Sequence, residues 1–152
     1  MAVVSGSNAA ELAFALAEQL GWEHHPLEVR RFPDSEGYVR VPQESIEAIR
    51  REPVVLVATT FPDSGIVEAL LMLESIHDVR RGDMSNLKGE GEQKLDDAGP
   101  GIFLAVPYFG YSRQDKRFQR GEVVSAKLLA RLLTRRCDGM VVLDLHAPAV
   151  LE

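Results

Sequence analysis

Short apolar runs alternate along the chain with segments whose apolar residues recur every three or four positions. Runs typical of buried strands lie at residues 2–5, 54–60, 102–106 and 140–145. Helical periodicity covers residues 12–20, 64–80 and 125–133. This alternation predicts a single α/β domain over residues 1–152, built on a mostly parallel, twisted sheet with flanking helices.

Turn residues set the expected ends of the first helix. Asn8 precedes the periodic segment and Glu11 follows three residues later, which favours Asn8 as the N-cap. Gly21 is a favourable C-terminal stop. His24 and His25 come next, and we expect them in an exposed connection rather than in a metal site.

A β-hairpin is predicted where strand-like residues 28–32 and 38–41 flank the turn-forming sequence Pro-Asp-Ser-Glu-Gly at 33–37. Its tip carries two carboxylates. We expect this hairpin to protrude from the domain.

Residues 82–100 interrupt the alternation of strands and helices. They hold five acidic residues, two lysines and four glycines, and little apolar content. Because connections in such folds usually run about 2 to 6 residues, we predict a mobile insertion loop here.

Length and composition indicate one globular core, since 152 residues with 45% hydrophobic content bury enough apolar surface. No apolar stretch approaches the roughly 20 residues that span a bilayer, so we expect a soluble, cytoplasmic protein without a membrane partner. The formal charge of −6 disfavours nucleic acid as a partner. The single cysteine, Cys137, leaves no internal disulfide to expect.

A local reversal of charge marks residues 106–122, which follow a predicted strand. Between residues 111 and 120 the single carboxylate of Asp115 is opposed by Arg113, Lys116, Arg117 and Arg120. Because the planar guanidinium group matches the geometry of phosphate oxygens, this segment favours an anionic ligand.

A carboxylate and an imidazole, Asp144 and His146, end the last predicted strand. Open parallel sheets bind ligands beyond the carboxyl ends of their strands, so we expect these two residues at the same edge as Arg113 and the Gly6-Ser7 turn. Together the residues predict a site for a metal and a nucleotide.

Five motifs, in order along the chain, resemble ribose-phosphate pyrophosphokinases. They are Val-Ser-Gly-Ser at 4–7 and the segments 31–40, 107–117, 125–130 and 144–147. The resemblance implies a phosphoribosyltransferase-like fold and the N-terminal half of an enzyme that uses Mg²⁺ and ATP. That enzyme transfers a diphosphoryl group to ribose 5-phosphate, giving 5-phosphoribosyl 1-pyrophosphate and AMP. The family's loop for ribose 5-phosphate is missing, so we expect the chain alone to be inactive.

The resemblance also implies a role for the hairpin in binding ATP. Phe32, Asp34 and Glu36 correspond to residues that receive the adenine of ATP in the site of a neighbouring subunit. Ser35 lies among them, where glycine is common, and serine adopts that turn conformation less freely. A homo-oligomer with its ATP site shared between subunits is therefore implied.

The remaining site residues follow in the same way. Arg113 and Gln114 correspond to nucleotide contacts, with Asp115 beside them. His146 corresponds to the residue that meets the magnesium–triphosphate unit, and Asp144 to a nearby metal-associated position. Arg113 and His146 are thus the catalytic candidates. No side chain is required as a nucleophile, because the ribose hydroxyl has that role in the family.

Two other functions stay open. A non-catalytic regulatory or assembly homologue would keep the fold and bind nucleotide. A true phosphoribosyltransferase would carry an acidic pair followed by a phosphate loop rich in threonine and glycine, which this sequence lacks. Oligomer size, allosteric control and the preferred diphosphoryl donor are not determined by these residues.

Overall fold

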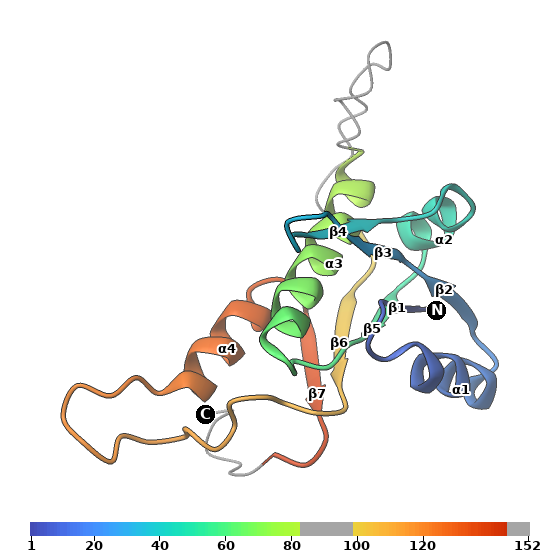
Figure 1. The fold of residues 1–152 in the computed structure, drawn as a ribbon. Coiled ribbons are helices and arrows are strands. Elements are labelled where there is room, and N and C mark those ends of the chain that lie inside the picture. Colours follow the sequence, from blue (N-terminus) through green and yellow to red (C-terminus); the bar gives the residue numbers. More distant parts are fainter. Residues whose placement is uncertain (83–98, 146–152) are drawn as a thin grey trace.

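The computed structural model describes residues 1–82 and 99–145, whose arrangement is shown in Figure 1. Most of the predicted loop at 82–100 and the predicted site residue His146 lie outside the described residues. Within the described ranges, no helix has both the length and the apolar character needed to cross a membrane.

Five parallel strands form one sheet in the order β2-β1-β5-β6-β7. Their bounds are β1 Ala2–Ser5, β2 Glu23–Pro26, β5 Val54–Val57, β6 Ile102–Val106 and β7 Gly139–Val142. The strand at the centre, β5, is a continuous β-branched and leucine run, as a strand covered on both faces requires. The predicted parallel α/β fold is confirmed.

Helices cover both faces of this sheet (Figure 1). They are α1 Ala10–Leu20, η1 Gln43–Ser45, α2 Ile46–Arg51, α3 Asp63–Arg81 and α4 Ser125–Thr134. On one face α1 packs its Ala13 against Val3. On the other face α3 and α4 share the larger core with Leu56 and Leu104. The three predicted helices are confirmed, whereas η1 and α2 were not predicted because so short a segment shows little periodicity.

The hairpin is formed by β3 Glu28–Arg31 and β4 Gly37–Arg40, which pair antiparallel. Its inner face packs on α3, and Val39 contacts the main core. The predicted hairpin is confirmed to within one residue at each end. At its tip Ser35 has φ 74°, the left-handed conformation that favours glycine.

The two predicted ends of α1 had different outcomes. Gly21 ends the helix in the left-handed conformation, as predicted, with φ 65°. The N-cap prediction was wrong, because Ala9 holds that position without a side-chain bond. The Asn8 side chain instead donates to the Thr59 carbonyl and accepts from the Thr59 N–H, both at 3.3 Å. Asn8 therefore links the turn after β1 to the turn after β5.

The prediction that His24 and His25 lie in an exposed connection was also wrong. Both belong to the edge strand β2, and both are partly buried. The His24 Nε2 lies 2.9 Å from the Ser5 hydroxyl, and the His25 Nδ1 lies 3.2 Å from the Ser45 hydroxyl. An edge strand of polar residues has no apolar alternation by which its sequence would be recognised.

Two strands are shorter than predicted at their carboxyl ends. The predicted strand at 54–60 ends at Val57, and the one at 140–145 ends at Val142. The residues after these points leave the sheet and form turns, so the polar groups of Thr59, Thr60 and Asp144 lie at the carboxyl edge.

Candidate functional site

The carboxyl edge of the sheet carries the loop at 107–124, between β6 and α4. Figure 1 shows this loop, in orange, reaching away from the sheet before the chain returns as α4. It contains the cationic segment singled out in the sequence.

The start of this loop is fixed on the turn that follows β5. The Thr60 N–H donates to the Tyr108 carbonyl at 3.1 Å, and the Gly110 N–H donates to the Thr60 hydroxyl at 2.6 Å. A Cβ atom on Gly110 would lie 2.4 Å from the Thr60 carbonyl oxygen. Only glycine permits this approach, so the two turns meet in one defined arrangement.

The next residue, Tyr111, extends this link to α3. It has φ 63°, and its hydroxyl donates to the Asp63 Oδ1 at 2.7 Å. That bond to the carboxylate raises the pKa of Tyr111, since it stabilises the protonated phenol. Asp63 is the first residue of α3.

The predicted nucleotide residues follow in a tight turn. The Gln114 N–H donates to the Tyr111 carbonyl at 3.1 Å, which places Arg113 inside the turn. The Ala126 N–H, in α4, donates to the Gln114 carbonyl at 3.3 Å. Arg113 is exposed and Asp115 is partly buried. Among the described residues, none forms an ion pair or hydrogen bond with the Arg113 side chain, so its guanidinium is available to a ligand.

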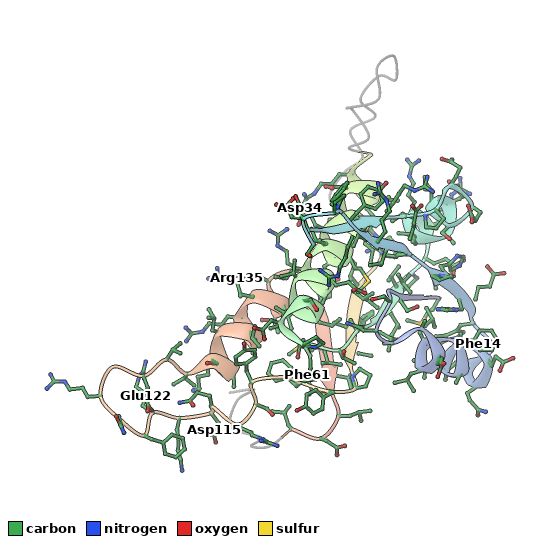
Figure 2. The ribbon with its side chains drawn as sticks, viewed as in Figure 1. Phe14, Asp34, Phe61, Asp115, Glu122 and Arg135 are labelled. Carbon is green, nitrogen blue, oxygen red and sulfur yellow. The ribbon has the colours of Figure 1, made fainter. Side chains whose placement is uncertain are left out.

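The far end of the loop folds around Glu122, labelled in Figure 2. The Glu122 carboxylate accepts from the backbone N–H groups of Phe118 and Gln119, at 2.6 and 3.0 Å. The bond from Phe118, followed by that from Gln119, lowers the pKa of Glu122. Arg117 donates to the Glu122 carbonyl at 2.8 Å. One acidic residue thus organises the tip of a cationic loop.

The hairpin tip forms a compact turn of its own. The Phe32 N–H donates to the Glu36 carbonyl at 2.9 Å, and the Glu36 N–H donates to the Asp34 carboxylate at 3.1 Å. Phe32 is 40% exposed, and the ring of Tyr38 lies edge-on to it at 5.9 Å. Glu36 and Ser35 line a groove of about 500 Å³ between the hairpin and α3.

The structure does not bring the hairpin tip and the loop after β6 together within one chain. Figure 2 shows Asp34 well apart from Asp115. Phe32, Ser35 and Glu36 belong to the same turn as Asp34, and Arg113 and Gln114 directly precede Asp115. The two predicted groups therefore form two separate surfaces of this chain.

At the end of β7, Asp144 is exposed and has φ 54°. Within residues 1–82 and 99–145 no three histidine, cysteine, aspartate or glutamate side chains are grouped as a metal cage. Mg²⁺ is commonly held by one or two carboxylates together with substrate phosphates. An exposed carboxylate at the carboxyl edge, such as Asp144, fits that mode of binding.

One residue of this edge was not predicted. Glu68, in α3, is only 7% exposed and accepts from Ser7 through both the backbone N–H and the hydroxyl. The sequence held a signal for it, because Glu68 lies on the apolar stripe of α3, four residues before Met72. A charged residue on a buried stripe requires a partner.

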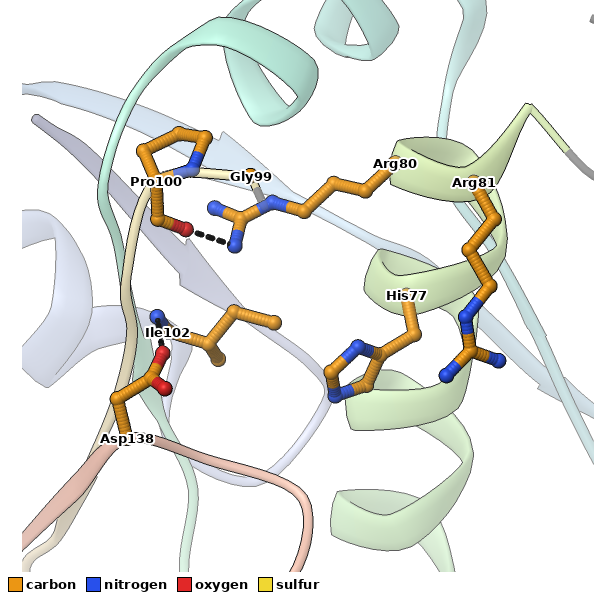
Figure 3. Close-up of a pocket in the computed structure, with 7 residues that line it drawn as sticks. All are labelled: His77, Arg80, Arg81, Gly99, Pro100, Ile102 and Asp138. Carbon is orange, nitrogen blue, oxygen red and sulfur yellow. Dashed lines mark hydrogen bonds between the residues drawn. The ribbon is translucent and has the colours of Figure 1, made fainter. Parts of the chain in front are cut away.

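A second hollow, of about 260 Å³, lies at the amino ends of β6 and β7, away from these residues. Figure 3 shows its lining, with Arg80 extended toward Pro100. The Arg80 guanidinium donates to the carbonyls of Ile49, Glu52 and Pro100. Since these carbonyls already take its N–H groups, Arg80 has a structural role.

Comparison with known proteins gives a consistent result. The protein-family model for the N-terminal domain of ribose phosphate pyrophosphokinase matches residues 1–82 and 98–136 of this chain. A ribose-phosphate pyrophosphokinase of Methanothermobacter thermautotrophicus is 35% identical over 152 residues, covering 99% of this chain and 46% of the relative. That of Methanopyrus kandleri is 34% identical over 154 residues, covering 100% and 45%. The chain thus spans slightly less than half the length of these relatives.

The crystal structure of phosphoribosylpyrophosphate synthetase from Mycobacterium smegmatis has a TM-score of 0.74 to this chain. The match covers 98% of this chain and 44% of the Mycobacterium smegmatis chain. At 22% sequence identity, this similarity supports the fold alone. The family resemblance inferred from the five motifs is confirmed by the family model, which matches most of the chain. The chain therefore belongs to the ribose-phosphate pyrophosphokinase family, in which it corresponds to the N-terminal domain.

Proposed function

We propose that this chain supplies the ATP-binding half of a ribose-phosphate pyrophosphokinase. The reaction transfers the diphosphoryl group of ATP to ribose 5-phosphate, giving 5-phosphoribosyl 1-pyrophosphate and AMP, in the cytoplasm. The observation that carries the proposal is the fixed turn from Tyr111 to Gln114, which presents an exposed Arg113 at the carboxyl edge of a parallel sheet.

Arg113 and Gln114 bind the polyphosphate of ATP in this proposal, with Asp115 beside them. A guanidinium donates two parallel hydrogen bonds to phosphate oxygens, and the Gln114 amide adds a neutral donor. Phosphoryl transfer gathers negative charge on those oxygens, so a fixed cation lowers the barrier by position and charge. Arg113 is therefore assigned a catalytic role.

The adenine is received by Phe32, Asp34, Ser35 and Glu36 of a neighbouring subunit. Figure 2 shows Asp34, at the hairpin tip, apart from Asp115, which lies two residues after Arg113, and this separation within one chain supports a site assembled from two copies. The exposed Phe32 ring offers a stacking surface, and the carboxylates accept from the adenine amino group. A homo-oligomer follows as the working form.

Mg²⁺ would be held by the phosphates of ATP together with Asp144 and His146. When bound, the ion neutralises charge on the transferring group. Asp144 supplies an oxygen ligand of the type that Mg²⁺ prefers. In this proposal His146 contacts the magnesium–triphosphate unit. His146 lies outside the described residues.

Calorimetric titration of the 152-residue chain with Mg²⁺-ATP tests the proposal. We expect weak, saturable binding that falls at least tenfold in Arg113→Ala, by about 1.4 kcal/mol or more. Arg131→Ala is the matched control, because Arg131 is exposed on α4 and should leave affinity unchanged. Equal affinity in Arg113→Ala and Arg131→Ala would contradict the proposal.

A second measurement separates the half-enzyme from a complete one. With ribose 5-phosphate added, we expect the chain alone to release no AMP, because it spans less than half the length of its relatives. Robust AMP release would show that this chain carries a whole active site. Binding without AMP release would also be the behaviour of a nucleotide-binding regulatory homologue. Joining the chain to the second half of a relative then distinguishes the two, since only the enzyme regains turnover.

A further inference from the structure

The hydroxyl of Tyr111 reaches from the loop after β6 to the first residue of α3. The phenol oxygen lies 2.7 Å from the Asp63 Oδ1, the short distance of a hydrogen bond to a carboxylate. The two residues are 48 positions apart in sequence. Their bond adds a side-chain link from this loop to α3, beside the Thr60 bonds that join the loop to the turn after β5.

Burial of the ring does not explain why tyrosine occupies this position. Tyr111 is 46% exposed, and its backbone has the left-handed conformation that a bulky residue adopts at a cost. A residue kept in that conformation needs an interaction that fixes it. The bond to Asp63 is such an interaction.

The same bond is the main side-chain attachment of the turn that carries Arg113. Within the described residues, no other side chain of segment 111–116 bonds to a different helix or strand. The turn closes through the Gln114 N–H on the Tyr111 carbonyl, at 3.1 Å. Its second attachment is a backbone bond from Ala126 to the Gln114 carbonyl, at 3.3 Å. The position of Arg113 is therefore set between the Tyr111 side chain and the Gly110 backbone on one side and α4 on the other.

Asp63 is suited to this role. It is in the first turn of α3, and no side chain caps that helix. A negative charge is favourable there, because the helix dipole is positive at the N-terminus. The Asp63 carboxylate thus offers Tyr111 an acceptor on a rigid element.

We infer that Tyr111 and Asp63 are positioning residues that hold the Arg113 turn in the conformation that receives the polyphosphate of ATP. This inference rests on the proposed function. Neither residue touches the nucleotide in it, and both act through Arg113. When the bond is lost, Arg113 is still present, but its turn samples several conformations. The affinity of the chain for Mg²⁺-ATP therefore falls.

Three variants test the bond by calorimetric titration with Mg²⁺-ATP. Tyr111→Phe and Asp63→Ala each remove it, and we expect affinity to fall about three- to tenfold, the range expected for one hydrogen bond. Asp63→Asn keeps an oxygen acceptor and should retain most of the affinity. Tyr108→Phe is the control, since in the described part of the chain no group bonds to the Tyr108 hydroxyl and it is also exposed.

The background of Arg113→Ala shows whether the effect passes through the arginine. There, Tyr111→Phe should cause no further loss. If Tyr111→Phe lowers the affinity for Mg²⁺-ATP in this background as much as it does in wild type, the inference is overturned. It is also overturned if Tyr111→Phe alone leaves the affinity unchanged while Arg113→Ala lowers it. If Arg113→Ala itself binds as well as wild type, the proposed function fails instead.

Amide hydrogen exchange in the free chain gives a readout that needs no ligand. The Gln114 amide, which closes the turn, should exchange at least threefold faster in Tyr111→Phe and Asp63→Ala and at the wild-type rate in Tyr108→Phe. Equal exchange of this amide in all four proteins would overturn the inference, even where binding is too weak to measure.

Discussion

The buried carboxylate of Glu68 accepts two hydrogen bonds from Ser7, one from the backbone N–H at 2.6 Å and one from the hydroxyl at 2.7 Å. Gly6 makes this approach possible, because a Cβ atom there would lie 2.3 Å from the Glu68 Oε1. The turn between β1 and α1 is thereby attached to α3, the same helix that begins with Asp63.

Replacing Glu68 with glutamine should destabilise the fold. Glutamine keeps the size of the side chain and can still bond to the Ser7 N–H and hydroxyl, but it replaces two charge-assisted hydrogen bonds with weaker neutral ones. We expect the free energy of unfolding to fall by about 1 to 3 kcal/mol in urea denaturation. Glu18→Gln, on the exposed face of α1, should change it little. Equal stability of the two variants would mean that the carboxylate of Glu68 contributes nothing.

Ser35→Gly should stabilise the hairpin. Ser35 has φ 74°, a conformation that costs an L-residue about 1 to 2 kcal/mol, while glycine adopts it freely. Part of that gain is lost to the greater entropy of unfolded glycine, so we expect a net increase of about 0.5 to 1 kcal/mol. Ser35→Ala is the matched control, because it removes the hydroxyl and keeps the Cβ atom. A gain of the same size in Ser35→Ala would assign the effect to the hydroxyl.

The strands and helices that the sequence predicts are those whose apolar pattern reflects burial. The centre of the sheet, Val54–Val57, and the long helix Asp63–Arg81 were predicted because their side chains face a core. The edge strand Glu23–Pro26 was missed because its stability comes from backbone pairing with β1 and from two histidines. Asn8 was misassigned because helix capping and bonding to a neighbouring turn both use a short polar side chain that bonds to backbone groups, so the residue type does not distinguish them.

The place of the candidate residues in the fold was predicted in part for a related reason. Arg113 and Asp144 lie at one edge of the sheet, as expected, because they follow apolar runs that end there. Tyr111 and Glu68 were not, since their partners Asp63 and Ser7 lie 48 and 61 positions away. Contacts over such separations depend on the folded arrangement, and local periodicity does not report them.

Stability should depend on pH through His24. Burial, followed by the charge of His25, lowers the pKa of His24 below its usual value near 6.5. The unfolded chain then binds the proton more readily than the folded chain, so stability is complete above about pH 6.5 and falls as the pH decreases. Denaturation of wild type at pH 7.5 and 5.5 should show this loss.

The matching variant is His24→Gln, which removes the titrating group and keeps a polar partner for Ser5. We expect a smaller difference in the free energy of unfolding between pH 7.5 and pH 5.5 than in wild type. If His24→Gln loses as much stability as wild type over this interval, another group is responsible for the pH dependence.

Arg80→Lys should weaken the attachment of α3 to the segments that precede β5 and β6. Figure 3 shows Arg80 reaching from the last turns of α3 toward Pro100. Its guanidinium also donates to the carbonyls of Ile49 at 3.1 Å and Glu52 at 2.9 Å. Burial lowers the pKa of Arg80, because it disfavours the charged form.

A lysine ammonium is a compact charge and does not reach three carbonyls arranged for a planar fork. We therefore expect Arg80→Lys to lose about 1 to 3 kcal/mol of unfolding free energy, because at least one of the three carbonyls loses its donor. Arg131→Lys, on the exposed face of α4, serves as the control and should be neutral. Chemical denaturation of both variants compares them directly. A neutral Arg80→Lys would show that the planar guanidinium is not required at these carbonyls.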